Sequence, residues 1–227
     1  MYYDSVSPLP PIDYHIHSNW SPDVDSHVTI DRLAYLYKCN NYATIIITDH
    51  SYSSKFSTKQ DVLNYKKECV FASLANNIHV IPGIEVDIDI DGNLDMDPEL
   101  LQMFDFVTGA IHREHNENTT NRLMTAICSN KIDAVAHPTN AIIGVRDPSP
   151  MNHELIFNAA AKYRVALEIN GIRQDLCCKY ITMAKKLGCR FICSSDSHNE
   201  NGVDHLEWCK QVAVETKLNT KDFYNLS

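Results

Sequence analysis

In the stretch Ile12-Asp13-Tyr14-His15-Ile16-His17, apolar residues alternate with residues that can bind a metal ion. Side chains alternate across a strand, so Asp13, His15 and His17 would all point to one face. Two imidazoles two residues apart can grip one ion, although a lone histidine is more often a hydrogen-bonded core or surface residue. The stretch therefore predicts a strand with a metal-capable face.

Outward from this strand, apolar β-branched runs alternate with segments of helical periodicity. We expect strands at residues 12–17, 43–49, 79–90, 106–112, 134–137, 165–170 and 190–196, with a short further strand at 211–214. We expect helices at residues 29–39, 58–76, 97–103, 120–129, 152–163 and 175–187. Seven or eight such units in one compact domain favour an α/β fold of the (β/α) barrel type, with a doubly wound open sheet as the alternative.

The length and composition suit a single domain. A chain of 227 residues that is 44% hydrophobic can bury one full core, so we expect one domain over residues 1–227 with its core at about 12–214. The longest apolar runs, 43–48 and 165–169, are too short to span a bilayer, and no export signal is evident. The eight scattered cysteines indicate free thiols, and we expect a cytoplasmic protein without membrane contact.

The charge of the chain limits its partners. A formal net charge of −9 disfavours a surface that tracks a long nucleic acid, because that task needs clustered Lys and Arg. A short or end-bound nucleic acid remains compatible with this charge. The unusual feature of the composition is its 11 histidines, so their positions carry the functional argument.

Metal-capable residues recur at the ends of the expected strands, and the third strand carries one near its middle. They are His15 and His17, His50, Glu85, His112, His137, Glu168 and Asn170, and Asp196 and His198. The carboxyl ends of barrel strands converge on one mouth, where these side chains would meet. Imidazole and carboxylate ligands without cysteine suit Zn, Mn, Fe or Co, and their number exceeds what one ion needs.

These segments resemble the polymerase and histidinol phosphatase (PHP) family from about residue 12 to residue 214. The motifs D-x-H-x-H, ITDH, GIEVD, the isolated His112, AHP, LEIN and SDSH stand in the family's order. Residues 83–95 and 136–139 are similar to the PHP domain of bacterial family X DNA polymerases, here standalone, without the polymerase part. The resemblance implies a distorted (β/α)7 TIM-like barrel that holds three divalent metal ions, with Zn, Mn or Fe as candidates.

The resemblance also implies which residues hold the ions. The first ion would be bound by His15, His17, Glu85 and Asp196. Glu85 would bridge to a second ion, completed by His112 and His137. The third would be bound by His50, His198 and a residue of the loop after the first strand. We expect Asp23 in that place, with Asp25 and His27 as alternatives.

Four further polar residues lie at the strand ends. Asp13 and Asp49 would orient imidazoles through their second ring nitrogen, or serve as strand-end hydrogen-bond acceptors. Glu168 and Asn170 close the sixth strand. Glu168 would either orient a ligand or brace the barrel.

The charge of the loaded site points to phosphate chemistry. Three divalent ions carry six positive charges, and Asp23, Glu85 and Asp196 carry three negative charges. The site would therefore be net positive and would attract a phosphate dianion. A metal-activated hydroxide would attack the ester, with Glu85 and Asp196 as catalytic ligands. His115 is a candidate proton donor to the leaving group. Three arginines of the loops expected at the barrel mouth, Arg113, Arg146 and Arg173, would either bind the phosphate or remain solvated loop charges.

The sequence thus predicts a metal-dependent phosphoesterase acting on a small phosphomonoester of the histidinol phosphate or nucleotide type. One alternative is a 3′-5′ exonuclease or DNA-end phosphatase, and another is amide or lactone hydrolysis on the same fold. A non-catalytic regulatory module braced by metal is the alternative from a different class. The sequence does not choose the physiological substrate, the metal or the oligomeric state.

Overall fold

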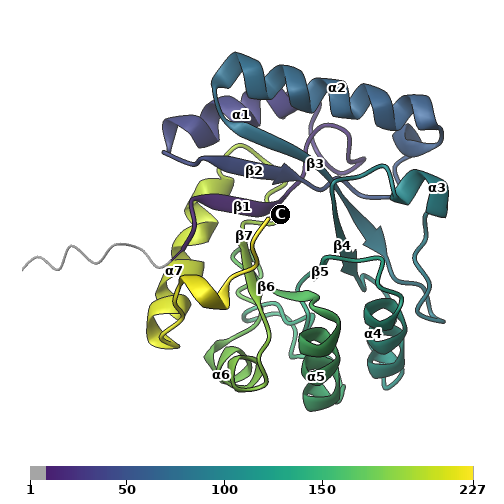
Figure 1. Ribbon diagram of the computed structural model, residues 1–227, viewed down its shortest axis with the longest axis vertical. Coiled ribbons are helices and arrows are strands. Elements are labelled where there is room, and N and C mark those ends of the chain that lie inside the picture. The colour runs from purple at the N-terminus through teal and green to yellow at the C-terminus, as the bar shows by residue number, and fades with distance from the viewer. Residues whose placement is uncertain (1–8, 227) are drawn as a thin grey trace, which may run out of the picture.

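The computed structural model describes residues 9–226, in which seven parallel strands form one sheet with helices between them (Figure 1). Each strand pairs with the next in the chain, in the order β1-β2-β3-β4-β5-β6-β7. The strands are β1 Ile12–Ile16, β2 Thr44–Ile47, β3 His79–Asp87, β4 Phe106–Ala110, β5 Ala134–Val135, β6 Ala166–Asn170 and β7 Phe191–Ser194. Every strand predicted over 12–196 is present.

The sheet curls until its first and last strands meet. His17 donates its backbone N–H to Ser197 O at 2.9 Å, and Asp196 donates to His15 O at 2.9 Å. Ile16 and Ser197 form a parallel bridge at the same place. The result is a nearly closed (β/α)7 barrel, so the predicted barrel is confirmed and the doubly wound alternative is wrong. The domain limits 1 and 227 lie outside the described residues and stay a prediction.

The helices begin where the local sequence satisfies their free backbone amides. Thr58 and Asp61 form the predicted capping box at the start of the second helix, and Asp97 caps the third, with Pro98 at its first position. The helices are α1 Ile30–Cys39, α2 Lys59–Asn76, α3 Pro98–Leu101, α4 Thr119–Cys128, α5 His153–Tyr163, α6 Cys178–Lys186 and α7 Leu206–Glu215. Short 3-10 turns lie at Ser54–Phe56, Gly202–His205 and Thr220–Asp222.

Two predicted segments differ from the structure. The strand predicted at 211–214 is wrong, because these residues belong to α7, which buries Leu206, Cys209 and Val212 at helical spacing. The sixth predicted helix begins at Cys178 rather than at residue 175. Asp175 is instead buried and accepts hydrogen bonds from the backbone and side chain of Thr139, in the loop after β5.

The barrel interior is filled, as in other parallel barrels, by side chains from alternate strands. At its amino end Tyr14 and Phe106 pack with their ring centroids 5.9 Å apart, among Ile46, Ile81 and Ile192. A second, larger apolar layer lies between the strands and the helices. The polar residues at the carboxyl ends of the strands are thus held on a rigid base.

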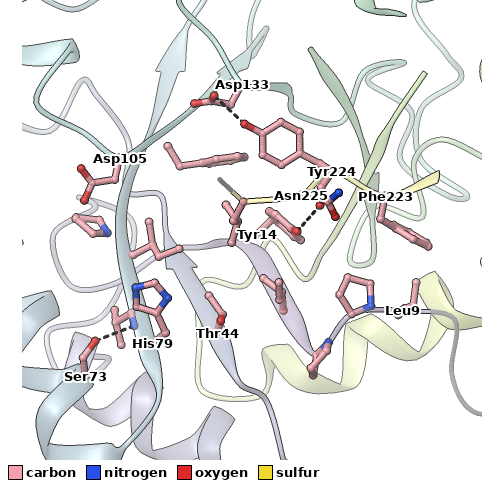
Figure 2. A pocket seen from close by; sticks show the side chains of 18 of the residues that line it. Leu9, Tyr14, Thr44, Ser73, His79, Asp105, Asp133, Phe223, Tyr224 and Asn225 are labelled. Carbon is pink, nitrogen blue, oxygen red and sulfur yellow. Dashed lines mark hydrogen bonds between the residues drawn. The ribbon is translucent and has the colours of Figure 1, made fainter. Parts of the chain in front are cut away.

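The amino end of the barrel opens into a cavity of about 1190 Å³ (Figure 2). The C-terminal segment partly closes it: Tyr14 Oη donates to Tyr224 O at 2.9 Å, and Tyr224 Oη donates to Asp133 Oδ1 at 3.1 Å. This cavity contains none of the predicted metal ligands. The metal-capable residues gather at the opposite end of the barrel.

Two properties bear on the expected surroundings of the chain. Within residues 9–226 no helix combines the length and the apolar character that crossing a membrane requires. All eight cysteines are free thiols, and four of them are buried.

Candidate metal centre

Four donor atoms from three strand ends form a buried cage. They are His15 Nε2, His17 Nε2, Glu85 Oε2 and Asp196 Oδ1. Five of their six separations lie between 2.9 and 3.7 Å. A tetrahedral ion with ligand bonds of about 2.1 Å holds its donors about 3.4 Å apart. The cage therefore has the dimensions that a zinc-sized ion requires.

Glu85 stands at the middle of the cluster. Its Oε1 lies 3.3 Å from His112 Nε2 and 3.3 Å from His137 Nε2, while its Oε2 faces the cage. Both carboxylate oxygens and His137 Nε2 are buried and have no hydrogen-bond partner among residues 9–226. Buried polar atoms without partners are costly. These orphaned atoms fit a site where divalent cations supply the missing interactions.

A third group lies at the outer edge. Asp23 Oδ2 is 3.4 Å from His50 Nε2 and 3.4 Å from His198 Nε2. Asp25 and His27 are exposed, and within the described chain neither forms an ion pair with these histidines. Of the three loop residues considered from the sequence, Asp23 is the one that the fold brings to His50 and His198.

The second ring nitrogen of most of these histidines meets an acceptor, which fixes the ring orientation. His15 Nδ1 lies 2.7 Å from Glu168 Oε1, and His198 Nδ1 lies 3.1 Å from Asp196 O. The remaining pairs are His17 with Ser21 Oγ at 3.2 Å, His112 with Asp87 Oδ1, and His137 with Asn140 Oδ1 at 3.3 Å. The Nε2 atoms are thereby left facing the cluster.

Three of these orienting residues were missed in the sequence: Ser21, Asp87 and Asn140. Asp87 lies two residues after Glu85 in the same strand, so strand alternation could have placed it on the same face. Ser21 and Asn140 lie in loops whose path the sequence does not reveal.

Asp13 and Asp49 accept hydrogen bonds from backbone N–H and hydroxyl groups and not from imidazoles. Asp13 accepts hydrogen bonds from Tyr37 Oη at 2.6 Å and from the Ser195 N–H at 3.0 Å. Asp49 accepts from the N–H and hydroxyl groups of Ser18 and Ser21 at 2.6 to 3.0 Å. Direct orientation of a ring nitrogen by either residue is therefore wrong, and the alternative of strand-end acceptors is right. Asp49 reaches His17 only through Ser21.

Glu168 and Asn170 connect the ligands beneath the centre. Besides His15 Nδ1, Glu168 accepts hydrogen bonds from Ser194 Oγ at 2.5 Å and from the His137 backbone N–H. The Asn170 side-chain amide donates to Glu168 Oε2 and to Asp196 Oδ2, both at 3.0 Å. Glu168 is thus placed to orient a ligand, which was one of its two predicted roles.

Two of the candidate ligands have left-handed backbone conformations. His137 has φ 29° and Asp196 has φ 52°, values that non-glycine residues adopt at an energetic cost. Each residue lies two positions after the last residue of a short strand, β5 or β7. The fold holds this strain where the side chains must turn into the centre.

The electrostatics favour an ionised Glu85. Burial raises the pKa of Glu85, but His112, His15 and His50 outweigh it and hold that pKa well below its usual range. Burial lowers the pKa of His50 and His112, yet chiefly the Glu85 carboxylate raises these values to about 9 and about 10. For His17, burial and then the charges of His198 and His50 lower the pKa. Without metal, His50 and His112 would therefore be protonated at neutral pH, and metal binding would release these protons.

The predicted substrate residues lie at different distances from the centre. Arg173 Nε donates to Asp196 Oδ2 at 3.0 Å, and Arg146 Nε donates to Asn140 O at 2.6 Å. Within residues 9–226 the buried ring nitrogens of His115 have no hydrogen-bond partner, and burial followed by the charge of Arg146 lowers its pKa to about 4. The exposed Arg113 side chain has no hydrogen bond or ion pair within residues 9–226, so the fold does not attach it to the centre.

Two more residues shape the mouth and were not predicted. The Tyr52 ring stacks on His50, with ring centroids 4.6 Å apart and planes inclined by 23°. Arg122 donates to the carbonyl groups of residues 88, 89, 113 and 114 at 2.5 to 3.1 Å. Arg122 thereby joins the loops after β3 and β4, which carry Glu85 and His112 at their bases.

The barrel and its cluster define a class of protein: a parallel α/β barrel with a histidine and carboxylate centre for divalent metal ions. The family model described as the PHP domain matches residues 13–171. The chain belongs to this family, as the order of its motifs predicted.

Curated relatives agree with this membership, and a solved structure shares the fold. The chain is 29% identical to the DNA polymerase/3′-5′ exonuclease PolX of Bacillus subtilis, over 94% of this chain but only 38% of the polymerase. It is 27% identical to a probable phosphatase of Acetivibrio thermocellus, over 82% of this chain and 79% of that protein. Histidinol phosphate phosphatase from Lactococcus lactis, solved with zinc, L-histidinol and phosphate, superposes with a TM-score of 0.70. It is 18% identical, over 96% of both chains.

Proposed function

We propose that this chain is a metal-dependent phosphoesterase that hydrolyses a small phosphomonoester. The observation that carries the proposal is Glu85, a buried carboxylate that accepts no hydrogen bond within residues 9–226 and has five imidazoles within 3.6 Å. A buried carboxylate is costly unless it is paired or coordinates a metal. Its position between two groups of donors suits a ligand that bridges two ions.

We assign three ions to the three groups of donors, with Zn, Mn or Fe as candidates. His15, His17, Glu85 and Asp196 would hold the first ion, and Glu85, His112 and His137 the second. Asp23, His50 and His198 would hold the third. The spacing of the donor atoms supports these groups. When bound, divalent ions supply an activated water and neutralise the charge of the phosphoryl group.

The chain's own residues would position the substrate. Arg173 uses Nε to hold Asp196, which leaves its terminal nitrogens for a phosphate oxygen, and Arg146 lies on the neighbouring loop. Arg113 would contact only the outer part of a substrate. Burial and then the charge of Arg146 lower the pKa of His115 to about 4, so it is neutral at pH 7 and can donate a proton only when a bound phosphate raises that pKa.

Small substrates are favoured over polymers. The relative named as a probable phosphatase matches this chain over most of both lengths, and the structural neighbour binds L-histidinol and phosphate. A net charge of −9 gives no support to binding a long nucleic acid. Histidinol phosphate and nucleotides remain the candidate substrates, and free thiols fit the proposed cytoplasmic setting.

A second candidate is hydrolysis at the 3′ end of DNA, because the PolX relative aligns with 94% of this chain. The two candidates differ in the substrate that is turned over. An oligonucleotide labelled at its 5′ end would be shortened by an exonuclease and left intact by a small-molecule phosphatase. The amide or lactone alternative predicts turnover of amides or lactones and no release of phosphate from an aryl phosphate.

The test is phosphate release from an aryl phosphate by metal-free protein reconstituted with Zn or Mn. We expect His15→Ala and Glu85→Ala to lower kcat/KM at least about 100-fold, since each removes a ligand. His79→Ala is the matched control, because His79 is exposed and lines the cavity at the amino end of the barrel. Unchanged turnover in the two ligand variants would contradict the proposal, and metal binding without any turnover would favour the non-catalytic module.

A further inference from the structure

Arg122, on α4, is a buried cation whose side chain donates hydrogen bonds only to backbone carbonyl groups within residues 9–226. The residue is 4% exposed. Its Nε donates to Asp89 O at 2.7 Å, and its Nη2 donates to Ile88 O at 2.5 Å. Its Nη1 donates to Arg113 O at 2.9 Å and to Glu114 O at 3.1 Å. A buried charge is costly unless it is paired or hydrogen-bonded, so these four bonds are what stabilises the guanidinium in this place.

The four carbonyl groups lie beside one side-chain contact of the candidate metal centre. They belong to the two residues that directly follow Asp87 and to the two that directly follow His112. Asp87 Oδ1 is the acceptor that contacts His112 Nδ1. The guanidinium of Arg122 therefore holds the backbone next to this imidazole and also the backbone next to its acceptor.

The loop after β4 depends on Arg122 more than the hairpin after β3 does. The Ile88 N–H donates to a β4 carbonyl group at 2.8 Å. The hairpin also rests directly on α4, where a Cβ at Gly92 would lie 2.5 Å from Thr125 Cβ. By contrast, the backbone of residues 112–115 has no hydrogen bond within residues 9–226 other than the two from Arg122.

His112 is the member of its donor group whose position depends on this loop. Glu85 lies within β3, and His137 is fully buried with its backbone N–H held by Glu168. His112 lies two residues beyond the end of β4, and its side chain is 21% exposed. The distance of 3.3 Å between His112 Nε2 and Glu85 Oε1 is therefore set in part by the backbone that Arg122 holds.

We propose that Arg122 is a positioning residue that keeps His112 in place to bind the second ion. This inference rests on the assignment of that ion to Glu85, His112 and His137 in the proposed function. Arg122 contacts neither the ion nor the substrate in this role, because its side-chain nitrogens are turned to the carbonyl groups of the two loops. Its loss should weaken the binding of one ion and loosen the loop after β4 even when no metal is bound.

Zinc titration of the metal-free full chain against a chromophoric chelator tests the effect on the ion. We expect Arg122→Met to raise the dissociation constant of one zinc ion about 10-fold, the lower end of the range for outer partners of ligating histidines. Arg122→Lys keeps the cation without the planar fork and should raise it about 3-fold, and this variant decides the test if Arg122→Met does not fold. Lys66→Met is the matched control. Lys66 also donates to a backbone carbonyl group, Met103 O at 2.8 Å, but it lines the cavity at the amino end of the barrel.

A double-mutant cycle separates positioning of His112 from a general loss of stability. In a His112→Ala background the second ion has already lost this ligand, so adding Arg122→Met should change zinc affinity less than about twofold further. A merely structural role of Arg122 would lower the affinity by the same factor in both backgrounds.

Trypsin digestion of the metal-free protein tests the effect on the loop. Arg113 is exposed, and its carbonyl group is one of the four acceptors. We expect cleavage after Arg113 to be about 10-fold faster in Arg122→Met, because the open form of the loop becomes more populated. Cleavage after the exposed Lys131, beyond the end of α4, is the internal reference and should not change.

Three results would overturn the proposal: equal zinc affinities in Arg122→Met and the wild type, an equal loss in both backgrounds of the cycle, or unchanged cleavage after Arg113. Zinc binding without phosphate release would contradict the proposed function and leave the role of Arg122 standing. A wild-type protein that binds no zinc would overturn both.

Discussion

Replacing Glu168 by Gln should weaken metal binding, although Glu168 is not itself one of the candidate ligands. Glu168 Oε1 accepts hydrogen bonds from His15 Nδ1 at 2.7 Å and from Ser194 Oγ at 2.5 Å. Its Oε2 accepts hydrogen bonds from Asn170 Nδ2 at 3.0 Å and from the His137 backbone N–H. All of these groups can donate, so either orientation of a Gln amide places an NH₂ group against donors. Toward His15, the NH₂ group favours an acceptor at Nδ1 and moves the ring proton to Nε2, the atom that faces the cage.

The size of the effect follows from the interaction that is lost. A hydrogen bond to a charged group contributes about 1.5 to 3 kcal/mol, and 1.4 kcal/mol is a factor of ten. Loss of an outer acceptor of a ligating imidazole costs about 10- to 100-fold in metal affinity or activity. We therefore expect Glu168→Gln to bind zinc about 10- to 100-fold more weakly and to lose a similar factor in kcat/KM at limiting metal.

The assay is a competition titration of zinc against a chromophoric chelator, followed by turnover of an aryl phosphate at fixed free metal. Glu207→Gln on α7 is the matched control, because its exposed carboxylate is remote from the centre. Far-UV circular dichroism reports whether the variant is folded. Folded Glu168→Gln with zinc affinity within twofold of the wild type would refute the role assigned to Glu168.

Three further predictions concern stability. Metal at 100 times its dissociation constant should raise the free energy of unfolding by about 2.7 kcal/mol relative to the same protein treated with a chelator, as measured by urea titration. Equal urea midpoints with and without metal would contradict metal binding by the folded protein. Gly171→Ala should destabilise the protein by about 1 to 3 kcal/mol, because its Cβ would lie 2.3 Å from His205 O; an unchanged melting temperature would refute the packing. Burial raises the pKa of Asp133 above its ordinary value of 3.8. The contribution of Asp133 to the free energy of unfolding therefore falls as the pH rises from 3.8 through the raised pKa. Asp133→Asn should therefore be more stable than wild type at pH 7 and equal to it at pH 3, and a difference independent of pH would contradict this reasoning.

Much of the fold was predictable because its signals are local. Alternation at 12–17 and the apolar run near Ile45 identify buried parallel strands, and Thr58 with Asp61 identifies a helix start. The exception at 211–214 shows the limit of such signals. A short apolar run such as Val212-Ala213-Val214 suits a strand or a buried helix face equally, and packing of Leu206 and Cys209 decided for the helix.

The residues that orient the cluster were less accessible. Asp49 was expected either to orient an imidazole or to accept strand-end hydrogen bonds, and it does the second, reaching His17 only through the loop residue Ser21. Asn140 contacts His137 only because the backbone of His137 is left-handed and turns the chain back on itself. Such contacts depend on loop paths, which no periodicity records.

By itself, the sequence predicted the order of the seven strands between residues 12 and 196 and the chemical character of the groups at their carboxyl ends, but not that residues 211–214 are helical. Spacing along one strand fixes which side chains share a face, since a strand has a period of two. Only the tertiary structure decided which groups meet across strands: Glu85 among five imidazoles, Asp23 between His50 and His198, and Asn170 between two carboxylates. Distances between residues far apart in the chain depend on how the barrel closes, and the closure is set by bonds such as Asp196 N–H to His15 O.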